Sequence, residues 1–144
     1  MKKYTLKDFE KFEVIDGIKQ CPSGDYSQID SFGKCCSFGE CCSFGEGCSF
    51  GERCSFGERC KVEGDKEILA FVKFEGFGSS KRCTYFFKLI DHSIYVRCGC
   101  FSGTLEEFRN KVKETHNDSF YAEGYLKIAD LAEWQLEGMV KNVK

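Results

Sequence analysis

The cysteines and histidines are the residues whose chemistry could define a functional site. The 144 residues contain 11 cysteines and 2 histidines. Thiolates and imidazoles bind zinc, and thiolates also act as nucleophiles or form disulfides. Two vicinal pairs, Cys35-Cys36 and Cys41-Cys42, are the most suggestive groupings.

The spacing of the cysteines argues for a structural role. Seven of them lie in residues 31–60, where one six-residue phrase occurs five times, as SFGKCC, SFGECC, SFGEGC, SFGERC and SFGERC. If the residues before each glycine are extended, Cys36 and Phe38 point inward while Cys35 points outward. Cys35 and Cys41 would then be the only zinc candidates, on neighbouring corners that do not converge on one point. We therefore expect no metal, no cofactor and reduced thiols that pack as small core residues.

The remaining chemistry-bearing residues give no catalytic motif. His92 and His116 do not stand in a pattern with a serine or cysteine and an acid, so a catalytic triad has no support. Cys98-Gly99-Cys100 is too tight for a redox CxxC motif. We expect no catalytic residues and no enzymatic activity.

The repeated phrase resembles the hexapeptide repeat of left-handed parallel β-helices. In that family a small residue precedes a large apolar one by two positions, and a glycine or polar residue forms the corner. The resemblance implies a short left-handed β-helix of two to three coils, in which residues eighteen apart stack. The expected core ladder consists of Phe32, Phe38, Phe44, Phe50 and Phe56 with Cys36, Cys42, Cys48, Cys54 and Cys60. A pentapeptide-repeat solenoid, with its period of five, and a flat array of hairpins are less favoured alternatives.

The sequence around the repeat predicts three parts: an N-terminal helix or cap (1–22), the repeat (23–66) and a C-terminal α+β domain (67–144). Thr5 is placed to cap the first helix, which either covers the open end of the repeat or docks on the C-terminal domain. Strands are expected over 68–74, 83–90 and 93–100. Two helices follow, the first from a capping box at Thr104. Leu131 and Trp134 are expected to widen the apolar stripe of the second. The C-terminal part should be a small antiparallel sheet covered by two helices.

The charge of the chain excludes a global basic field, because the formal net charge is -2 and the pI is near 5.8. Lys81, Arg82, Lys88 and Arg97, interleaved with aromatic residues, form a candidate surface for single-stranded nucleic acid. The alternative is that the aromatic residues are core and the cations ordinary surface. We identify neither a signal peptide nor an apolar segment of membrane-spanning length, so we expect the cytoplasm of a bacterium or phage-infected host, and no membrane partner.

These observations favour a non-enzymatic interaction or assembly protein, with the repeat as a rigid scaffold or self-association surface. A homo-oligomer is expected, since trimers are common in the fold that the repeat resembles. The tandem SFGE phrases are also similar to those of uncharacterised small proteins of gut bacteria and their phages, and this resemblance implies no activity. One alternative is a phage counter-defence inhibitor that binds a bacterial nuclease or a nucleic acid. The other is an unrecognised enzyme.

Overall fold

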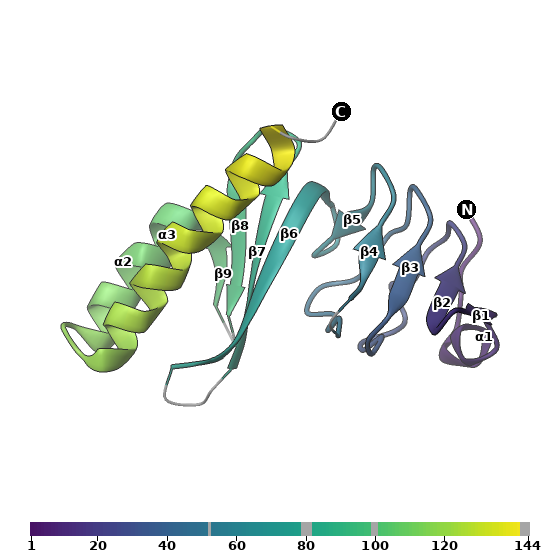
Figure 1. Ribbon diagram of the computed structural model, residues 1–144, viewed down its shortest axis with the longest axis horizontal. Coiled ribbons are helices and arrows are strands. Elements are labelled where there is room, and N and C mark those ends of the chain that lie inside the picture. The colour runs from purple at the N-terminus through teal and green to yellow at the C-terminus, as the bar shows by residue number, and fades with distance from the viewer. Residues whose placement is uncertain (52, 79–81, 99–100, 142–144) are drawn as a thin grey trace. The chain divides into compact units, whose positions relative to one another are not determined.

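The structure is a computed structural model that describes residues 1–51, 53–78, 82–98 and 101–141 (Figure 1). The chain divides into two compact units, Met1–Ile68 and Leu69–Lys144. The three-part division expected from the sequence stays a prediction.

The first unit contains the repeat and a mixed four-stranded sheet. Its elements are α1 (Leu6–Glu10), β1 (Val14–Ile15), β2 (Ile18–Cys21), β3 (Cys36–Phe38), β4 (Ser55–Phe56) and β5 (Lys61–Val62). The sheet order is β1-β2-β3-β4, where β1 and β2 form an antiparallel hairpin and the other pairs are parallel. Figure 1 shows β2, β3 and β4 side by side. The capping box predicted at Thr5 is confirmed, with Asp8 as its partner.

The expected left-handed hexapeptide β-helix is wrong as the fold class of this protein. The described residues form a four-stranded sheet, a five-stranded sheet and three helices, which is an α+β architecture. The repeat supplies only the short strands β3 and β4, and its other parallel contacts are single bridges such as Ser31 with Ser49. The reason is a corner at the fifth position of every phrase. The backbone there has a φ between 58° and 72°, at Cys35, Cys41, Gly47, Arg53 and Arg59. Only two or three residues remain extended between corners, which is too few for continuous ladders.

The glycines at the third position of the later phrases have a different role from the one expected. Glycine was expected to supply the corner, but Gly39, Gly45, Gly51 and Gly57 do not have a positive φ. A side chain would instead collide with backbone at Gly51 and Gly57 and would be tightly confined by it at Gly39 and Gly45. A Cβ at Gly57, for example, would lie 2.6 Å from the amide nitrogen of Glu40. Glycine is required there because two segments of backbone approach closely.

The predicted stacking of rings eighteen residues apart is confirmed. Phe32 stacks on Phe50 with ring centroids 5.3 Å apart, and Phe38 stacks on Phe56 at 5.4 Å. Tyr26 continues the pattern by stacking on Phe44 at 5.6 Å. Rings of successive phrases meet edge to face, which is one of the two geometries that aromatic pairs prefer. The core of the first unit is therefore a continuous cluster of aromatic rings.

The residues expected in the core ladder are mostly buried. Those with at most 3% of their surface exposed are Phe32, Phe38, Phe44, Phe50, Cys36, Cys42, Cys48 and Cys60, whereas Phe56 and Cys54 are half-buried. The N-terminal segment packs on the same cluster. Tyr4 stacks on Tyr26, and Phe9 of α1 meets Phe32 edge to face. The N-terminal residues thus cover the first rings of the cluster.

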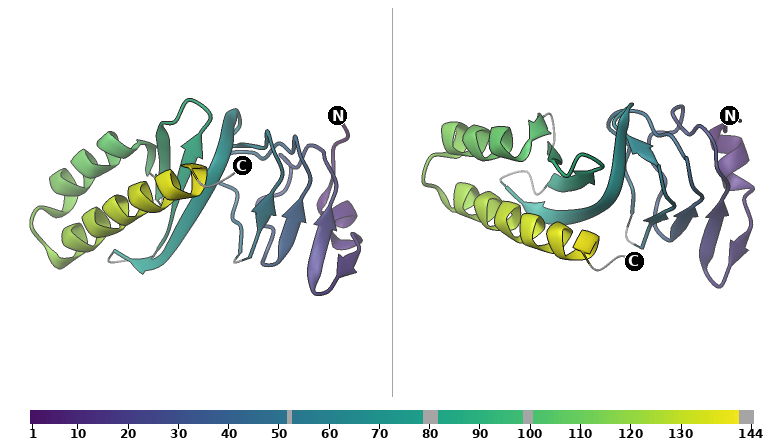
Figure 2. Two further views of the ribbon diagram at one scale, coloured as in Figure 1. Left: turned by 45° about the horizontal axis from the view of Figure 1, so that its top comes forward. Right: turned by 90° about the horizontal axis from the view of Figure 1, so that it is seen from above.

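The second unit is an antiparallel sheet covered by two helices. Its elements are β6 (Lys66–Phe77, which starts in the first unit), β7 (Arg82–Leu89), β8 (Ile94–Cys98), β9 (Phe101–Thr104), α2 (Leu105–His116) and α3 (Phe120–Lys141). The sheet order is β5-β6-β7-β8-β9. Figure 2 shows α2 and α3 side by side on one face of the sheet. The capping box at Thr104 is confirmed, whereas β9 was not expected.

The core of this unit decides how α3 is oriented. Phe86 and Val96 of the sheet pack against Phe108 of α2 and against one face of α3. The fully or nearly buried residues of α3 are Ala122, Tyr125, Ile128, Ala129, Ala132 and Leu136. The expectation that Leu131 and Trp134 widen the buried stripe is wrong, because they are 49% and 69% exposed. Within the described residues, none of the helices has the length and apolar character needed to span a membrane.

Candidate functional site

The thiols inside the repeat donate hydrogen bonds to backbone carbonyls. The Sγ atoms of Cys42 and Cys60 both lie near the carbonyl oxygen of Gly39, at 3.1 and 3.3 Å. Cys48 makes the corresponding contact with Gly45 at 3.2 Å. A thiol is a small apolar group with one weak donor. The regular cysteine therefore fills the core and also satisfies the carbonyls beside the corners.

The environment of Cys36 and Cys42 suppresses the reactivity of these two thiols, whereas the hydrogen bond with Cys42 lowers the pKa of Cys60 to about 7. The hydrogen bond with the thiol of Cys21, together with burial, raises the pKa of Cys36 to about 11. The hydrogen bond with the thiol of Cys60, followed by burial, also raises the pKa of Cys42. Because the thiolate is the reactive form, protonated thiols are poor nucleophiles and poor metal ligands at neutral pH.

Cys35 and Cys41, the two zinc candidates, occupy corners of the repeat. Both have a positive φ, and Cys41 is exposed whereas Cys35 is half-buried. Among the described residues, no cluster of three or more histidine, cysteine, aspartate or glutamate side chains could hold a metal ion. The structure thus places these two cysteines at corners of the repeat.

Cys98 lies in a hydrogen-bonded cluster of the second unit. Its Sγ accepts from the Thr84 hydroxyl at 3.2 Å and lies 3.7 Å from the Tyr125 hydroxyl. Cys100 lies outside the described residues. His116 packs near the Tyr125 ring, with centroids 5.7 Å apart, and His92 is exposed in the β7–β8 turn. The described residues of this cluster include no acid that would complete a catalytic triad.

The candidate nucleic-acid surface is only partly covered by the described residues. Lys81 and the side chain of Arg82 lie outside them. Lys88 is half-buried on β7. Arg97 is only 9% exposed, and its guanidinium lies 4.3 Å from the centroid of the Tyr85 ring, a cation–π arrangement. Arg97 therefore belongs to the packed sheet, and binding of nucleic acid stays a prediction.

Large apolar side chains are exposed on α3. Phe120 is 84% exposed, Leu131 49% and Trp134 69%, and Trp134 is the only tryptophan of the chain. At 100° per residue, these positions lie opposite the buried residues of α3. We call these three residues the outer face of α3. An exposed tryptophan beside an exposed leucine is typical of a protein-binding surface, since tryptophan dominates many interfaces.

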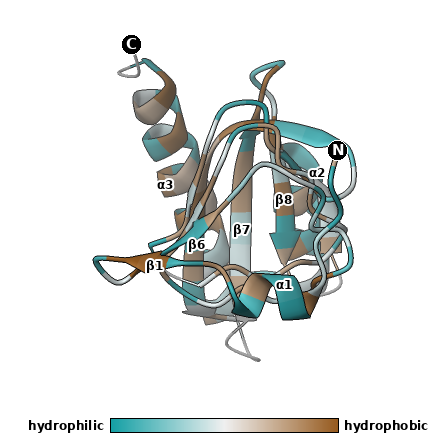
Figure 3. Cartoon of the chain, turned by 90° about the vertical axis from the view of Figure 1, so that its right-hand side faces the viewer, coloured by the Kyte–Doolittle hydropathy of each residue, from teal (hydrophilic) through white to brown (hydrophobic). Residues whose placement is uncertain are grey.

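A smaller apolar patch lies on the β1–β2 hairpin. Val14, Ile15 and Ile18 are 56%, 49% and 40% exposed. Figure 3 shows β1 in the brown of apolar residues. This strand has only two residues, so it offers few backbone groups for pairing with another strand.

The amino-acid sequence of α3 contains a signal for its outer face, although the size of the apolar residues conceals it. Ala122, Tyr125, Ala129, Ala132 and Leu136 recur at steps of three and four, which is the spacing of one buried helix face. The larger Leu131 and Trp134 outweigh these small alanines when residues are judged by size. The size of Leu131 and Trp134 favours burial, although their positions on the helix do not lie on the face of the small buried residues.

Comparison with known proteins gave no relatives: no protein-family model, no curated protein and no solved structure matched this chain.

Proposed function

We propose that this chain is a non-enzymatic interaction protein, in which the first unit is a rigid scaffold and the outer face of α3 binds a protein. The observation that carries the proposal is the exposure of Trp134 and Leu131 on the side of α3 opposite its core. Burial of apolar surface is the main favourable contribution to most protein association. Such a face is therefore suited to a partner.

The first unit supports the role of scaffold. The ring of Phe38, for example, has five other rings with centroids within 6 Å of its own, those of Tyr26, Phe32, Phe44, Phe50 and Phe56. Dense packing of this kind resists deformation. The raised pKa values of Cys36 and Cys42 favour a structural role over a catalytic one for these two thiols.

A photo-crosslinking experiment tests the binding surface. The photoreactive residue p-benzoylphenylalanine replaces Trp134 in cells that naturally produce the chain. Matched variants carry it at Lys111, which is exposed on α2, and at Val14 of the hairpin patch. We expect irradiation to give a discrete protein adduct from position 134 only. No adduct from position 134, or equal adducts from all three positions, would contradict the proposal.

A further inference from the structure

The charged residues around the outer face of α3 form a symmetric pattern. Two ion pairs of the i,i+4 type lie there, with Nζ–Oε1 distances of 2.9 Å for Lys127–Glu123 and 3.2 Å for Lys141–Glu137. All four side chains are more than half exposed. The helical phase places Glu123, Glu137 and Lys141 along one flank of the outer face and Lys127 within it.

The centre of this pattern lies at Ala132. Lys127 and Glu137 lie five residues to either side of it, and Glu123 and Lys141 lie nine residues to either side. Each pair thus matches a cation on one side with an anion at the same distance on the other. Leu131 and Trp134 lie close to this centre.

An antiparallel second copy converts this symmetry into complementary contacts. When two identical helices pack antiparallel about a two-fold axis, the same flank of each helix faces the other. A residue on one side of the axis then meets the residue of the second helix that lies equally far on the opposite side of the axis in the sequence. With the axis near Ala132, Lys127 faces Glu137 of the second copy and Glu123 faces its Lys141. Leu131 then lies beside the second copy's Trp134, which buries the apolar centre.

A parallel arrangement lacks this complementarity. It would bring the flank that carries most of these charges against the opposite flank of the second helix. That flank carries Gly124 and Gln135, which are uncharged. The charge pattern therefore favours the antiparallel arrangement, since matched charges set register and orientation.

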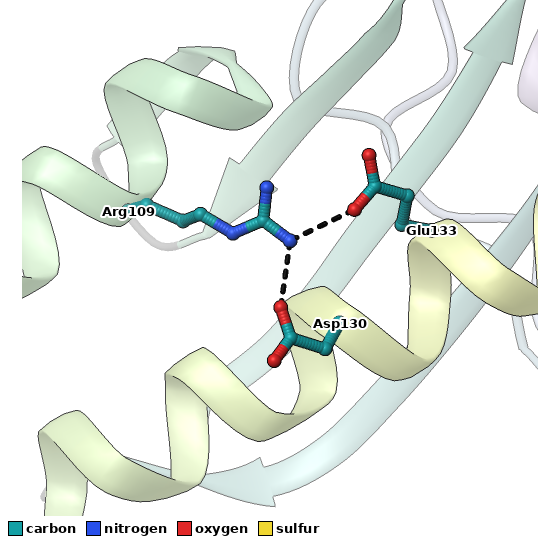
Figure 4. Close-up of polar contacts among 3 residues, drawn as sticks. All are labelled: Arg109, Asp130 and Glu133. Carbon is teal, nitrogen blue, oxygen red and sulfur yellow. Dashed lines mark hydrogen bonds and ion pairs between the residues drawn. The ribbon is translucent and has the colours of Figure 1, made fainter.

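The acidic residues nearest the axis are already partly neutralised. Asp130 and Glu133 lie within two residues of Ala132, so two copies would bring four carboxylates together. Arg109 of α2 donates from Nη2 to both of them, at 2.7 Å to Asp130 and 3.0 Å to Glu133 (Figure 4). This cation reduces the repulsion that would otherwise oppose the pairing.

We propose that the outer face of α3 binds the same face of a second copy of this chain, antiparallel and about a two-fold axis near Ala132. This inference rests on the proposed function, because it names the partner of the same surface. It also requires that Lys127 and Glu137 meet across the interface.

The first test is sedimentation equilibrium of the full chain with two single charge reversals. Lys127→Glu leaves glutamates at both facing positions, and Glu137→Lys leaves lysines at both. Each variant alone should dissociate about tenfold more readily than the unchanged chain, because attraction becomes repulsion at both symmetric contacts. Lys111→Glu, a reversal on α2, is the matched control and should not change the dissociation constant.

Mixing the two variants gives the decisive measurement. In a mixed dimer, the glutamate at 127 faces the lysine at 137, and Glu137 of one chain faces Lys127 of the other. We expect an equimolar mixture to dimerise about as tightly as the unchanged chain. A folding defect would not be repaired by mixing, so the rescue reports the antiparallel register itself.

The outcomes separate this inference from the proposed function. If the unchanged chain stays monomeric while crosslinking from position 134 captures a different protein, the outer face of α3 binds that protein and not a second copy. The proposed function then survives, and this inference does not. If Trp134→Ala abolishes dimerisation but mixing does not rescue the charge variants, the antiparallel register is wrong. If dimerisation survives Trp134→Ala undiminished, the copies meet through another surface and the inference that the outer face of α3 pairs with itself is wrong.

Discussion

At the scale of single residues, two positions of the repeated phrase carry opposite backbone requirements. The fifth position has a left-handed backbone, and it holds cysteine, glycine or arginine. At the third position of the last four phrases an added Cβ would lie only 2.5 to 3.1 Å from another segment of backbone, and the residue is always glycine. The sequence shows an invariant glycine without showing why it is needed, so the backbone freedom of the corner was assigned to the glycine, although Cys35 and Cys41 of the fifth position were correctly expected at corners.

Two alanine substitutions separate these requirements. Gly47→Ala should cost about 1 kcal/mol of unfolding free energy, because alanine at a φ of 72° is strained but meets no atom within 4 Å. Gly57→Ala should cost clearly more, roughly 2 kcal/mol or above, because its Cβ would displace the backbone of Glu40. Urea unfolding of both variants measures the difference. Equal losses, or the reverse order, would show that close approach is not the reason for the third-position glycine.

At the scale of elements, prediction succeeded where the period was strong and failed where burial depended on distant partners. The pairing of Phe32 with Phe50 follows from the six-residue period together with three phrases per coil, which the resemblance to hexapeptide repeats implied. The capping box at Thr104 follows from local hydrogen bonding and was also predictable. The orientation of α3 was not, because Trp134 is exposed only as a result of which face the sheet covers. The candidate site on α3 was therefore found from the structure.

The ring cluster should be the main source of stability of the first unit. Phe38 is 2% exposed at its centre, so Phe38→Ala should cost about 3 to 5 kcal/mol through lost transfer energy and a residual cavity. Leu6→Ala on α1 is the control and should change the unfolding free energy by less than about 0.5 kcal/mol, because Leu6 is exposed. Thermal unfolding followed by circular dichroism measures both. A loss of unfolding free energy below about 1 kcal/mol for Phe38→Ala would show that the ring cluster is not the main source of stability of the first unit.

At the scale of the whole molecule, the buried ionisable groups of the first unit link its folding to alkaline pH. Burial raises the pKa of Tyr26, and the neighbouring Cys21 thiol with burial raises that of Cys36 from 9.0 to about 11. In the unfolded chain these groups ionise near their ordinary values, whereas in the folded chain they keep their protons. The stability that Tyr26 and Cys36 contribute is therefore fully present below about pH 9, and the part from Cys36 falls as the pH rises toward 11.

A cysteine substitution isolates one part of this dependence. Between pH 9 and 11, Cys36 should contribute a loss of at most about 1.4 kcal/mol per pH unit. Cys36→Ala should flatten the decline of unfolding free energy by that amount, whatever its effect at neutral pH. Cys41→Ala, at an exposed corner, should leave the slope unchanged. Urea unfolding at a series of pH values measures the slopes, and parallel slopes for Cys36→Ala and the unchanged chain would refute the linkage.

The eighteen-residue offset between bridged partners also bears on how the gene can change length. A tandem repeat of six residues changes length by the gain or loss of whole phrases. The stacked partners, such as Phe38 and Phe56, lie eighteen residues apart. Gain of three phrases would therefore keep every later residue at its place in this pattern, whereas gain of a single phrase would shift it by one third of the pattern. Length variants of this gene should therefore persist in steps of eighteen codons, although the mutational unit is six.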